Sequence, residues 1–149
     1  IGIGIVGCGR ISTMHAPAYL QHPAAEIVAV CDRDLELARD RQRAWGARAA
    51  YGDLADLLAD VRVDAVEILL PHHLHRAAAL AALAAGKHVS LQKPPTFTVG
   101  ELRELDAAAR RAGRCLRVFE NFMYYPPHVR ARALIAEGAI GEPLSVRLK

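Results

Sequence analysis

The sequence predicts an α/β fold in which a doubly wound parallel sheet carries helices on both faces. Short β-branched runs alternate with helical patterns of about ten to fifteen residues, and this alternation is typical of βαβ units. A glycine-rich turn directly follows the first run. The 149 residues, 52% hydrophobic and 23% charged, suffice for one globular domain with a sizeable core.

Six strands are expected where the β-branched runs occur. Their ranges are 1–6, 26–32, 48–51, 64–70, 88–91 and 115–119. Between them, Thr98 and Glu101 have the spacing of a capping box, and Asp53 can cap a short helix. A glycine that can end a helix in the left-handed conformation occurs at Gly46, Gly86 and Gly113. The strands and helices together complete a doubly wound sheet.

Charge and cysteine content restrict the class of partner. The formal net charge of +3 comes from arginines scattered among acidic residues, without the basic block or aromatic-and-basic stripe that a nucleic-acid groove needs. No apolar run is long enough to span a membrane. We therefore expect a small-molecule partner. Cys8, Cys31 and Cys115 are odd in number and form no CxxC pair, which favours a reducing, cytoplasmic compartment over a disulfide framework.

The first candidate site is the segment GIVGCGRISTMH. Gly7 and Gly9 follow a strand and precede a helical pattern, so the backbone can turn tightly and approach a pyrophosphate at the helix N-terminus. Ser12 takes the third position, where glycine or alanine is usual, and is small enough for close helix packing. Asp32, 20 positions after Ser12, can accept both hydroxyls of a ribose. This register predicts a Rossmann dinucleotide site; the alternative is a glycine turn that binds no nucleotide.

The residues at the end of the second strand bear on the choice of cofactor. A carboxylate at Asp32 repels a 2′-phosphate, which favours NAD over NADP. The adjacent Arg33 can pack on the adenine or bind that phosphate, so NADP stays possible.

A second segment, ILLPHHLHRAAALAALAAGKHVSLQKPP, carries a family resemblance. A strand ending in a proline, a histidine a few residues on, an A-G-K-H-V stretch and an E-K-P motif are typical of the Gfo/Idh/MocA family, the relatives of glucose-fructose oxidoreductase and inositol dehydrogenase. The matching residues are Pro71, His75, 85–89 and 92–94. The resemblance covers essentially the whole chain, and it implies the N-terminal portion of such an oxidoreductase.

The resemblance gives Lys93 a catalytic role. It implies a place at the carboxyl end of the fifth strand, beside the nicotinamide, where family members use the lysine to polarise the substrate hydroxyl or relay its proton. Ligands of open α/β sheets lie at that edge, where a partly desolvated lysine is suited to proton transfer. The alternative is a strand-end lysine in solvent. Gln92 replaces the usual glutamate and loses its charge, and the Lys93–Pro94 bond is expected to be cis.

The predicted cofactor contacts lie at the glycine turn, at the ends of the second, fourth and fifth strands, and after the sixth. They are Gly7, Gly9, Arg10, Ile11, Ser12, Asp32, Arg33, Leu70, Pro71, His72, His75, Gln92, Lys93 and Asn121. No metal site is expected, because no carboxylate or cysteine accompanies His72, His73 and His75 at ligand spacing. His15 matches a frequent family histidine and is expected to pack under the loop. The charge of Glu67 inside DAVEILL has no explanation from the sequence.

Two domains are expected, with a boundary after residue 120. Residues 1–120 read as an NAD(P)-binding Rossmann domain. In 121–149 aromatics cluster and two prolines suit a helix start, so this part is expected to be a connecting helix and the first strand of a truncated C-terminal α+β domain. The chain opens on a strand-like run without methionine and stops inside another, PLSVRLK, so we expect a piece of a longer protein.

The functional hypothesis is an NAD(P)-dependent oxidoreductase that transfers a hydride between the nicotinamide and a sugar, polyol or sugar-like hydroxyl. The resemblance implies that a second acid-base residue, and the surface for homo-oligomers, lie in the missing domain, so this chain is expected to bind dinucleotide without turnover. Two alternatives stay open: redox-assisted elimination or glycosidic cleavage with retained NAD, and a dinucleotide-sensing regulator without catalysis.

Overall fold

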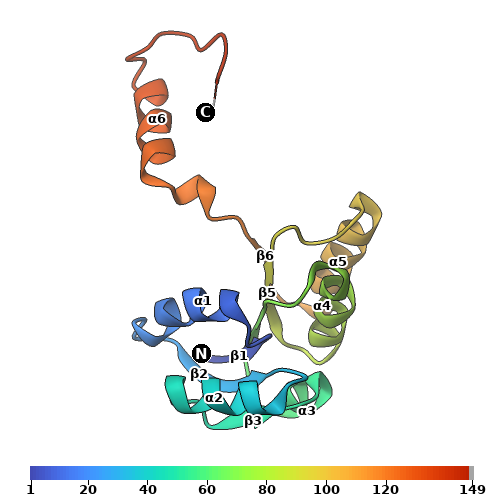
Figure 1. The fold of residues 1–149 in the computed structure, drawn as a ribbon. Helices are drawn as coiled ribbons and strands as arrows, with labels where there is room; N and C mark the ends of the chain where they lie inside the picture. Colours follow the sequence, from blue (N-terminus) through green and yellow to red (C-terminus); the bar gives the residue numbers. More distant parts are fainter. Residues whose placement is uncertain (148–149) are drawn as a thin grey trace. The chain divides into compact units, whose positions relative to one another are not determined.

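The computed structural model describes residues 1–147 in two units, and the first unit ends at Phe119. The first unit contains six parallel strands in the order β3-β2-β1-β4-β5-β6, joined by helices (Figure 1). One half of the sheet runs outward from β1 to β3 and the other from β4 to β6. This is the doubly wound arrangement of the Rossmann fold. The predicted fold class of the first unit is therefore confirmed.

The elements of the first unit match the predicted runs closely. The strands are β1 (Gly2–Val6), β2 (Glu26–Cys31), β3 (Ala49–Tyr51), β4 (Ala65–Ile68), β5 (His88–Gln92) and β6 (Leu116–Phe119). The helices are α1 (Arg10–Leu20), α2 (Leu35–Trp45), α3 (Leu54–Ala59), α4 (His75–Ala84) and α5 (Val99–Ala112), with a 3-10 turn η1 (His72–Leu74) before α4. All six predicted strands are present, and only their ends move, by one or two residues.

Local side-chain chemistry fixes several helix ends as predicted. The carboxylate of Asp53 accepts the backbone N–H of Ala55 at 2.7 Å and begins α3. At α5 both halves of the capping box form, since the Thr98 hydroxyl accepts the N–H of Glu101 at 3.2 Å and the Glu101 carboxylate accepts the N–H of Thr98 at 3.1 Å. Gly46 ends α2 in the left-handed conformation, with φ 70°.

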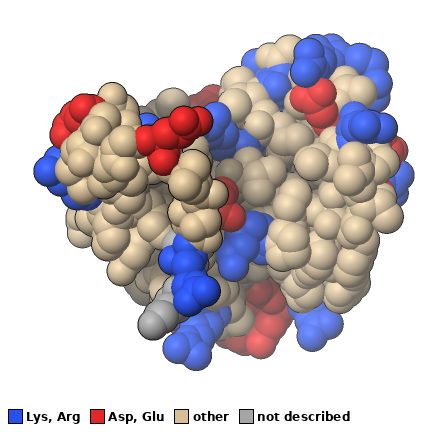
Figure 2. All heavy atoms as spheres, turned by 90° about the horizontal axis from the view of Figure 1, so that it is seen from above, with Lys and Arg blue, Asp and Glu red and all other residues tan. Residues whose placement is uncertain are grey.

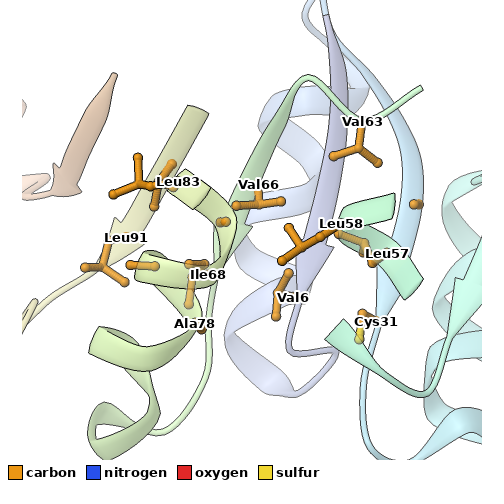
Figure 3. Packing of buried hydrophobic residues seen from close by; sticks show 14 of the residues in the cluster. Val6, Cys31, Leu57, Leu58, Val63, Val66, Ile68, Ala78, Leu83 and Leu91 are labelled. Carbon is orange, nitrogen blue, oxygen red and sulfur yellow. The ribbon is translucent and has the colours of Figure 1, made fainter. Parts of the chain in front are cut away.

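The hydrophobic core has one layer on each face of the sheet. Helices α3, α4 and α5 cover one face, where Leu57, Leu83 and Leu105 are fully buried. Figure 3 shows part of this layer, with the side chains of Val66 and Ile68 from β4 between those of α3 and α4. Helices α1 and α2 cover the other face with small residues such as Ala16 and Ala38. Each fully buried Leu or Ile contributes about 1.5–3 kcal/mol relative to an exposed one.

The second unit contains a 3-10 turn η2 (Phe122–Tyr124) and helix α6 (Pro126–Ala136), whose two prolines lie at its start as predicted. The strand expected over 143–149 is not formed at residues 143–147, and its last two residues lie outside the described part. A strand needs a neighbouring strand for its backbone hydrogen bonds, and residues 120–147 contain none. The assignment of 121–149 to a further domain stays a prediction.

The surface carries charges of both signs. Figure 2 shows Lys and Arg side chains at several places on one face, interrupted by Asp and Glu and by uncharged areas. Within residues 1–147, no helix combines the length and the apolar character that crossing a bilayer requires.

Candidate functional site

The glycine turn lies where the strand order reverses. β1 pairs with β2 on one side and with β4 on the other, so the carboxyl end of β1 is at the switch point of the sheet. The N–H of Gly7 donates to the carbonyl oxygen of Cys31 at 2.8 Å, and the N–H of Leu69 donates to that of Val6 at 2.8 Å. Ligands of open α/β sheets bind outside the carboxyl ends of the strands at such a point.

The two glycines of the turn have different reasons to be there. Gly7 has φ +96°, and a Cβ on it would lie 2.8 Å from the carbonyl oxygen of Leu69, so the fold itself requires glycine. Gly9 has φ −72°, and a Cβ there would meet no described atom within 4 Å. No described residue requires glycine at position 9, and the space beside it is open.

The N-terminus of α1 is prepared for an anion. Gly9 is its N-cap, no side chain of the described residues caps it, and its first turn holds no acidic residue. The Ser12 hydroxyl instead donates back to the carbonyl oxygen of Gly9 at 2.6 Å, and Ser12 is fully buried, which fits the small third residue of the fingerprint. Arg10 and Ile11 begin the helix and are exposed. The backbone N–H groups of this turn and the helix dipole suit a pyrophosphate.

Asp32 connects the end of β2 to the glycine turn. Its Oδ2 accepts the N–H of Cys8 at 2.8 Å, and its Oδ1 accepts the N–H of Asp34 at 3.0 Å. The carbonyl oxygen of Cys8 in turn accepts from Nε of Arg41 at 3.1 Å. The backbone N–H and the backbone C=O of Cys8 are therefore both hydrogen-bonded to side chains. A carboxylate has about four acceptor positions, which leaves capacity for ribose hydroxyls at the half-buried Asp32. Arg33 beside it is exposed.

The two cysteines of this region are core groups. Burial raises the pKa of the Cys8 thiol to about 12, and burial raises that of Cys31 to about 12 as well. Both thiols therefore stay protonated at neutral pH.

His75 braces the two loops that follow β4 and β5. It is 2% exposed, and its ring nitrogens face two carbonyl oxygens, Nε2 that of Leu70 at 2.9 Å and Nδ1 that of Pro94 at 3.0 Å. Each ring nitrogen thus already faces a carbonyl oxygen of the protein, and the predicted contact of His75 with the cofactor stays a prediction. Its position at the start of α4 is as predicted.

His72, unlike His75, has a ring nitrogen that no described residue contacts by a hydrogen bond. Its ring lies 4.1 Å from that of Phe97, between centroids, and its Nε2 atom is buried without a hydrogen-bond partner among the described residues. An unsatisfied buried nitrogen at the edge of a candidate site is a place where a ligand or water is expected. His73 is exposed, and residues 1–147 contain no group of three His, Cys, Asp or Glu side chains that could hold a metal.

Lys93 directly follows β5, at the same edge of the sheet as the glycine turn. Its side chain is exposed and has no ion-pair partner in the part of the chain that the structure describes. The Lys93–Pro94 bond is cis, as expected. The side-chain oxygen of Gln92, Oε1, accepts the backbone N–H of Lys93 at 2.8 Å. The solvent exposure of Lys93 matches the alternative of a strand-end lysine in solvent, and Gln92 fixes the backbone that carries the side chain.

Glu67 is the site residue that sequence reasoning left unexplained. It is fully buried, its Oε1 lies 3.0 Å from Nδ1 of His15, and its Oε2 accepts the Tyr19 hydroxyl at 2.5 Å. Burial alone would raise the pKa of Glu67, but hydrogen bonds from His15, Ser90 and Tyr19 outweigh it and lower the pKa. The sequence contained one signal: His15 and Tyr19 are four residues apart and so share a face of α1.

The structure gathers most predicted residues at one edge of the sheet. Gly7, Gly9, Ser12 and Asp32 meet around the turn after β1, while Leu70, Pro71, His72, Gln92 and Lys93 follow β4 and β5. Asn121 belongs to the second unit, and its contact with a cofactor stays a prediction.

A sheet of this strand order, with a glycine turn at its switch point and an acid after the second strand, defines a nucleotide-binding domain of the Rossmann class. The chain belongs to the Gfo/Idh/MocA oxidoreductase family, with an NAD-binding Rossmann fold, whose pattern matches residues 1–120. It is 37% identical over 139 residues to D-apiose dehydrogenase of Paraburkholderia graminis, covering 93% of this chain and 37% of that protein.

Solved structures agree with this family. An oxidoreductase from Agrobacterium radiobacter in complex with NAD+, L-tartaric acid and magnesium matches with a TM-score of 0.90 at 31% identity, over 96% of this chain and 42% of the other. A variant of a 3-ketoreductase from Actinomadura kijaniata, with TDP-benzene and NADP, matches with a TM-score of 0.89 at 33% identity, over 95% of this chain and 45% of the other. The chain thus spans roughly two fifths of the length of these relatives.

Proposed function

We propose that this chain binds NAD and that the whole protein transfers a hydride between the nicotinamide and a CH–OH group of a sugar, polyol or sugar-like substrate. The observation that carries the proposal is the uncapped start of α1, open beside Gly9, on the same edge of the sheet as the unpaired ammonium of Lys93. The names of two relatives, a D-apiose dehydrogenase and a 3-ketoreductase, support this class of reaction.

Each residue has a distinct task in this proposal. The backbone N–H groups at the start of α1 hold the pyrophosphate, and Asp32 accepts the ribose hydroxyls. The nicotinamide supplies the hydride chemistry when it is bound. Lys93 donates a hydrogen bond to the substrate oxygen and relays its proton. His72 lies at the same edge, with its buried Nε2 unpartnered among the described residues.

The preference for NAD over NADP rests on charge. The Asp32 carboxylate, held by the N–H groups of Cys8 and Asp34, stands at the end of β2, where a 2′-phosphate would be repelled. The two structural relatives were solved with NAD+ and with NADP, so the family accommodates both. The exposed Arg33 is the group by which this chain could accept NADP.

Isothermal titration of the 149-residue chain with NAD+ and with NADP+ tests the cofactor. We expect NAD+ to bind at least about tenfold more tightly than NADP+, and Asp32→Asn to reduce that ratio, since a neutral amide no longer repels the phosphate. A folded chain that binds neither nucleotide contradicts the proposal.

Turnover tests the reaction in the whole protein. On a panel of sugars and polyols, Lys93→Met should keep NAD+ binding and lose at least about a hundredfold in kcat, which is the usual contribution of a proton-transferring group. Entry of solvent deuterium at a substrate carbon without net oxidation would instead indicate elimination with retained NAD. Binding of NAD+ without any turnover would indicate a dinucleotide-sensing regulator. The cytoplasmic location and the homo-oligomer stay predictions.

A further inference from the structure

A series of hydrogen-bonded polar side chains, buried at Glu67 and half-buried at His15 and Gln92, leads from the middle of the sheet to Lys93. Glu67 on β4 faces α1, where His15 and Tyr19 contact its two carboxylate oxygens. The other nitrogen of His15, Nε2, lies 3.3 Å from the side-chain Nε2 of Gln92. Glu67 pairs with Ser90 in the ladder between β4 and β5, and Gln92, two residues further, therefore points to the same face.

The donor and the acceptor of each hydrogen bond from Lys93 back to Glu67 can be deduced by starting at the backbone N–H of Lys93. A backbone N–H can only donate, so the Gln92 atom that receives the N–H of Lys93 at 2.8 Å is the amide oxygen. The Gln92 atom that faces His15 is then the NH2 group, which is a donor. Nε2 of His15 must accept from it, so the ring proton is on Nδ1 and is donated to Glu67.

A protonated imidazole does not fit this arrangement. It would place an N–H of His15 against the NH2 of Gln92, two donors facing each other at 3.3 Å. Turning the Gln92 amide over would only move the conflict to the N–H of Lys93, at 2.8 Å. This geometry favours a neutral ring on a carboxylate over an ion pair for His15 and Glu67. The ring is 13% exposed and lies against Phe119, with 4.7 Å between the ring centroids.

We propose that Glu67 is a positioning residue for Lys93, which it reaches through a fixed tautomer of His15 and the oriented side-chain amide of Gln92. The Glu67 carboxylate keeps the ring proton of His15 on Nδ1. The non-protonated Nε2 of His15 then accepts from the Gln92 NH2 group and so orients the amide. The amide oxygen of Gln92 in turn accepts the backbone N–H of Lys93. The inference rests on the proposed function only for the role of Lys93. The hydrogen-bond chain itself is a property of these residues.

The residue at position 92 sets the charge of His15 in this scheme. A glutamate there would be an acceptor toward both Lys93 and His15, so the ring would need a proton on each nitrogen. With glutamine the cluster holds one carboxylate and a neutral ring; with glutamate it would hold two carboxylates and a cationic ring. The net charge of the cluster is the same in both cases. Gln92→Glu should therefore convert the neutral His15 ring into an imidazolium without adding net charge to the cluster.

The tautomer can be measured directly by long-range 1H–15N NMR on the 149-residue chain. We expect His15 at neutral pH to show a protonated Nδ1 and a non-protonated Nε2. In Gln92→Glu both nitrogens should be protonated. A wild-type ring with its proton on Nε2, or on both nitrogens, would overturn the proposal without any variant being needed.

Variants of Glu67 separate positioning from plain stability. Glu67→Leu should release the tautomer and speed hydrogen exchange of the Lys93 amide by about tenfold, the effect of losing one hydrogen bond. Glu67→Gln keeps an acceptor for Nδ1 and should retain the tautomer. Tyr19→Phe is the matched control, because it removes a different donor to Glu67 and leaves the His15 contact intact. Equal changes in Tyr19→Phe and Glu67→Leu would reduce Glu67 to a structural role and refute the proposal.

These measurements need neither cofactor nor turnover. Absence of dinucleotide binding would contradict the proposed function and leave the NMR result intact. A wrong tautomer would contradict the positioning role and leave NAD binding intact. In the whole protein, Glu67→Leu should lower kcat more than Tyr19→Phe does, at equal affinity for NAD+.

Discussion

The carboxylate of Asp32 accepts the backbone N–H of Cys8 at 2.8 Å, which fastens the glycine turn after β1 to the end of β2. The residue expected from the sequence to contact a ribose therefore also builds the turn on which the pyrophosphate would rest. Its second oxygen accepts the N–H of Asp34 at 3.0 Å, just before α2 begins. A change at position 32 consequently affects both the fold and the cofactor.

Substitutions at Asp32 should separate these two roles. Asp32→Ala removes a charged acceptor from two backbone N–H groups, and we expect a loss of about 1.5–3 kcal/mol in the free energy of unfolding. Asp32→Asn keeps one oxygen acceptor and should lose less. Urea unfolding followed by circular dichroism measures both variants. An alanine variant as stable as wild type would mean that the two hydrogen bonds add nothing to the stability of the turn.

The two glycines of the turn should respond oppositely to alanine. Gly7→Ala forces a Cβ to within 2.8 Å of the Leu69 carbonyl oxygen at φ +96°, so we expect a loss of stability of about 1–3 kcal/mol. Gly9→Ala meets open space at an ordinary φ and should change stability by less than about 0.5 kcal/mol.

The same pair also tests ligand binding. If the open space beside Gly9 is where the pyrophosphate approaches, Gly9→Ala should weaken NAD+ binding by at least about tenfold while the chain stays folded. Thermal unfolding and titration calorimetry on one preparation give both numbers. Unchanged NAD+ affinity in Gly9→Ala would show that the pyrophosphate does not bind at this turn.

A single sequence contains the local determinants of structure more fully than the long-range ones. Strands, caps and the glycine turn were predictable because their determinants are local: Thr98 and Glu101 are three residues apart, and Gly7 and Gly9 follow β1 directly. Glu67 was not explained, because its partner His15 is 52 residues away and meets it only when α1 packs on the sheet.

His75 shows a second limit of such predictions. The family pattern gives its position along the chain correctly, at the start of α4. The direction of its ring depends on two carbonyl groups, of Leu70 and Pro94, that come together only after β4 and β5 have paired. The absence of a strand at residues 143–147 has a similar reason, since a strand needs a partner that the described residues after 120 do not supply.

His75 should matter for stability although it contacts no ligand in this scheme. His75→Ala leaves the carbonyl oxygens of Leu70 and Pro94 without their nitrogen partners, and we expect a loss of about 1–3 kcal/mol. His73→Ala, two residues away and exposed, is the control and should stay within about 0.5 kcal/mol of wild type. Chemical denaturation compares the two. Similar stabilities would show that His75 does not brace the loops.

Glu67 should make the stability of the chain sensitive to acid. Its hydrogen bonds lower the pKa of the folded carboxyl below the value of about 4.3 expected in the unfolded chain. As the pH falls, the unfolded state therefore binds the proton first. The stabilisation is fully present above about pH 4.3 and is lost as the pH falls through the folded pKa.

Urea unfolding at a series of pH values from about 7 to about 3 measures this dependence. Glu67→Gln cannot titrate and should flatten the curve below about pH 4.3. Tyr19→Phe removes one of the hydrogen bonds that lower the pKa of Glu67 and should narrow the acid-sensitive range. Asp60, whose pKa is lowered by hydrogen bonds from Arg62, should leave a residual slope in every variant. A Glu67→Gln curve parallel to that of wild type would mean that the buried carboxyl has the same pKa in the folded and unfolded chain, and the hydrogen bonds from His15 and Tyr19 would then not favour its charged form.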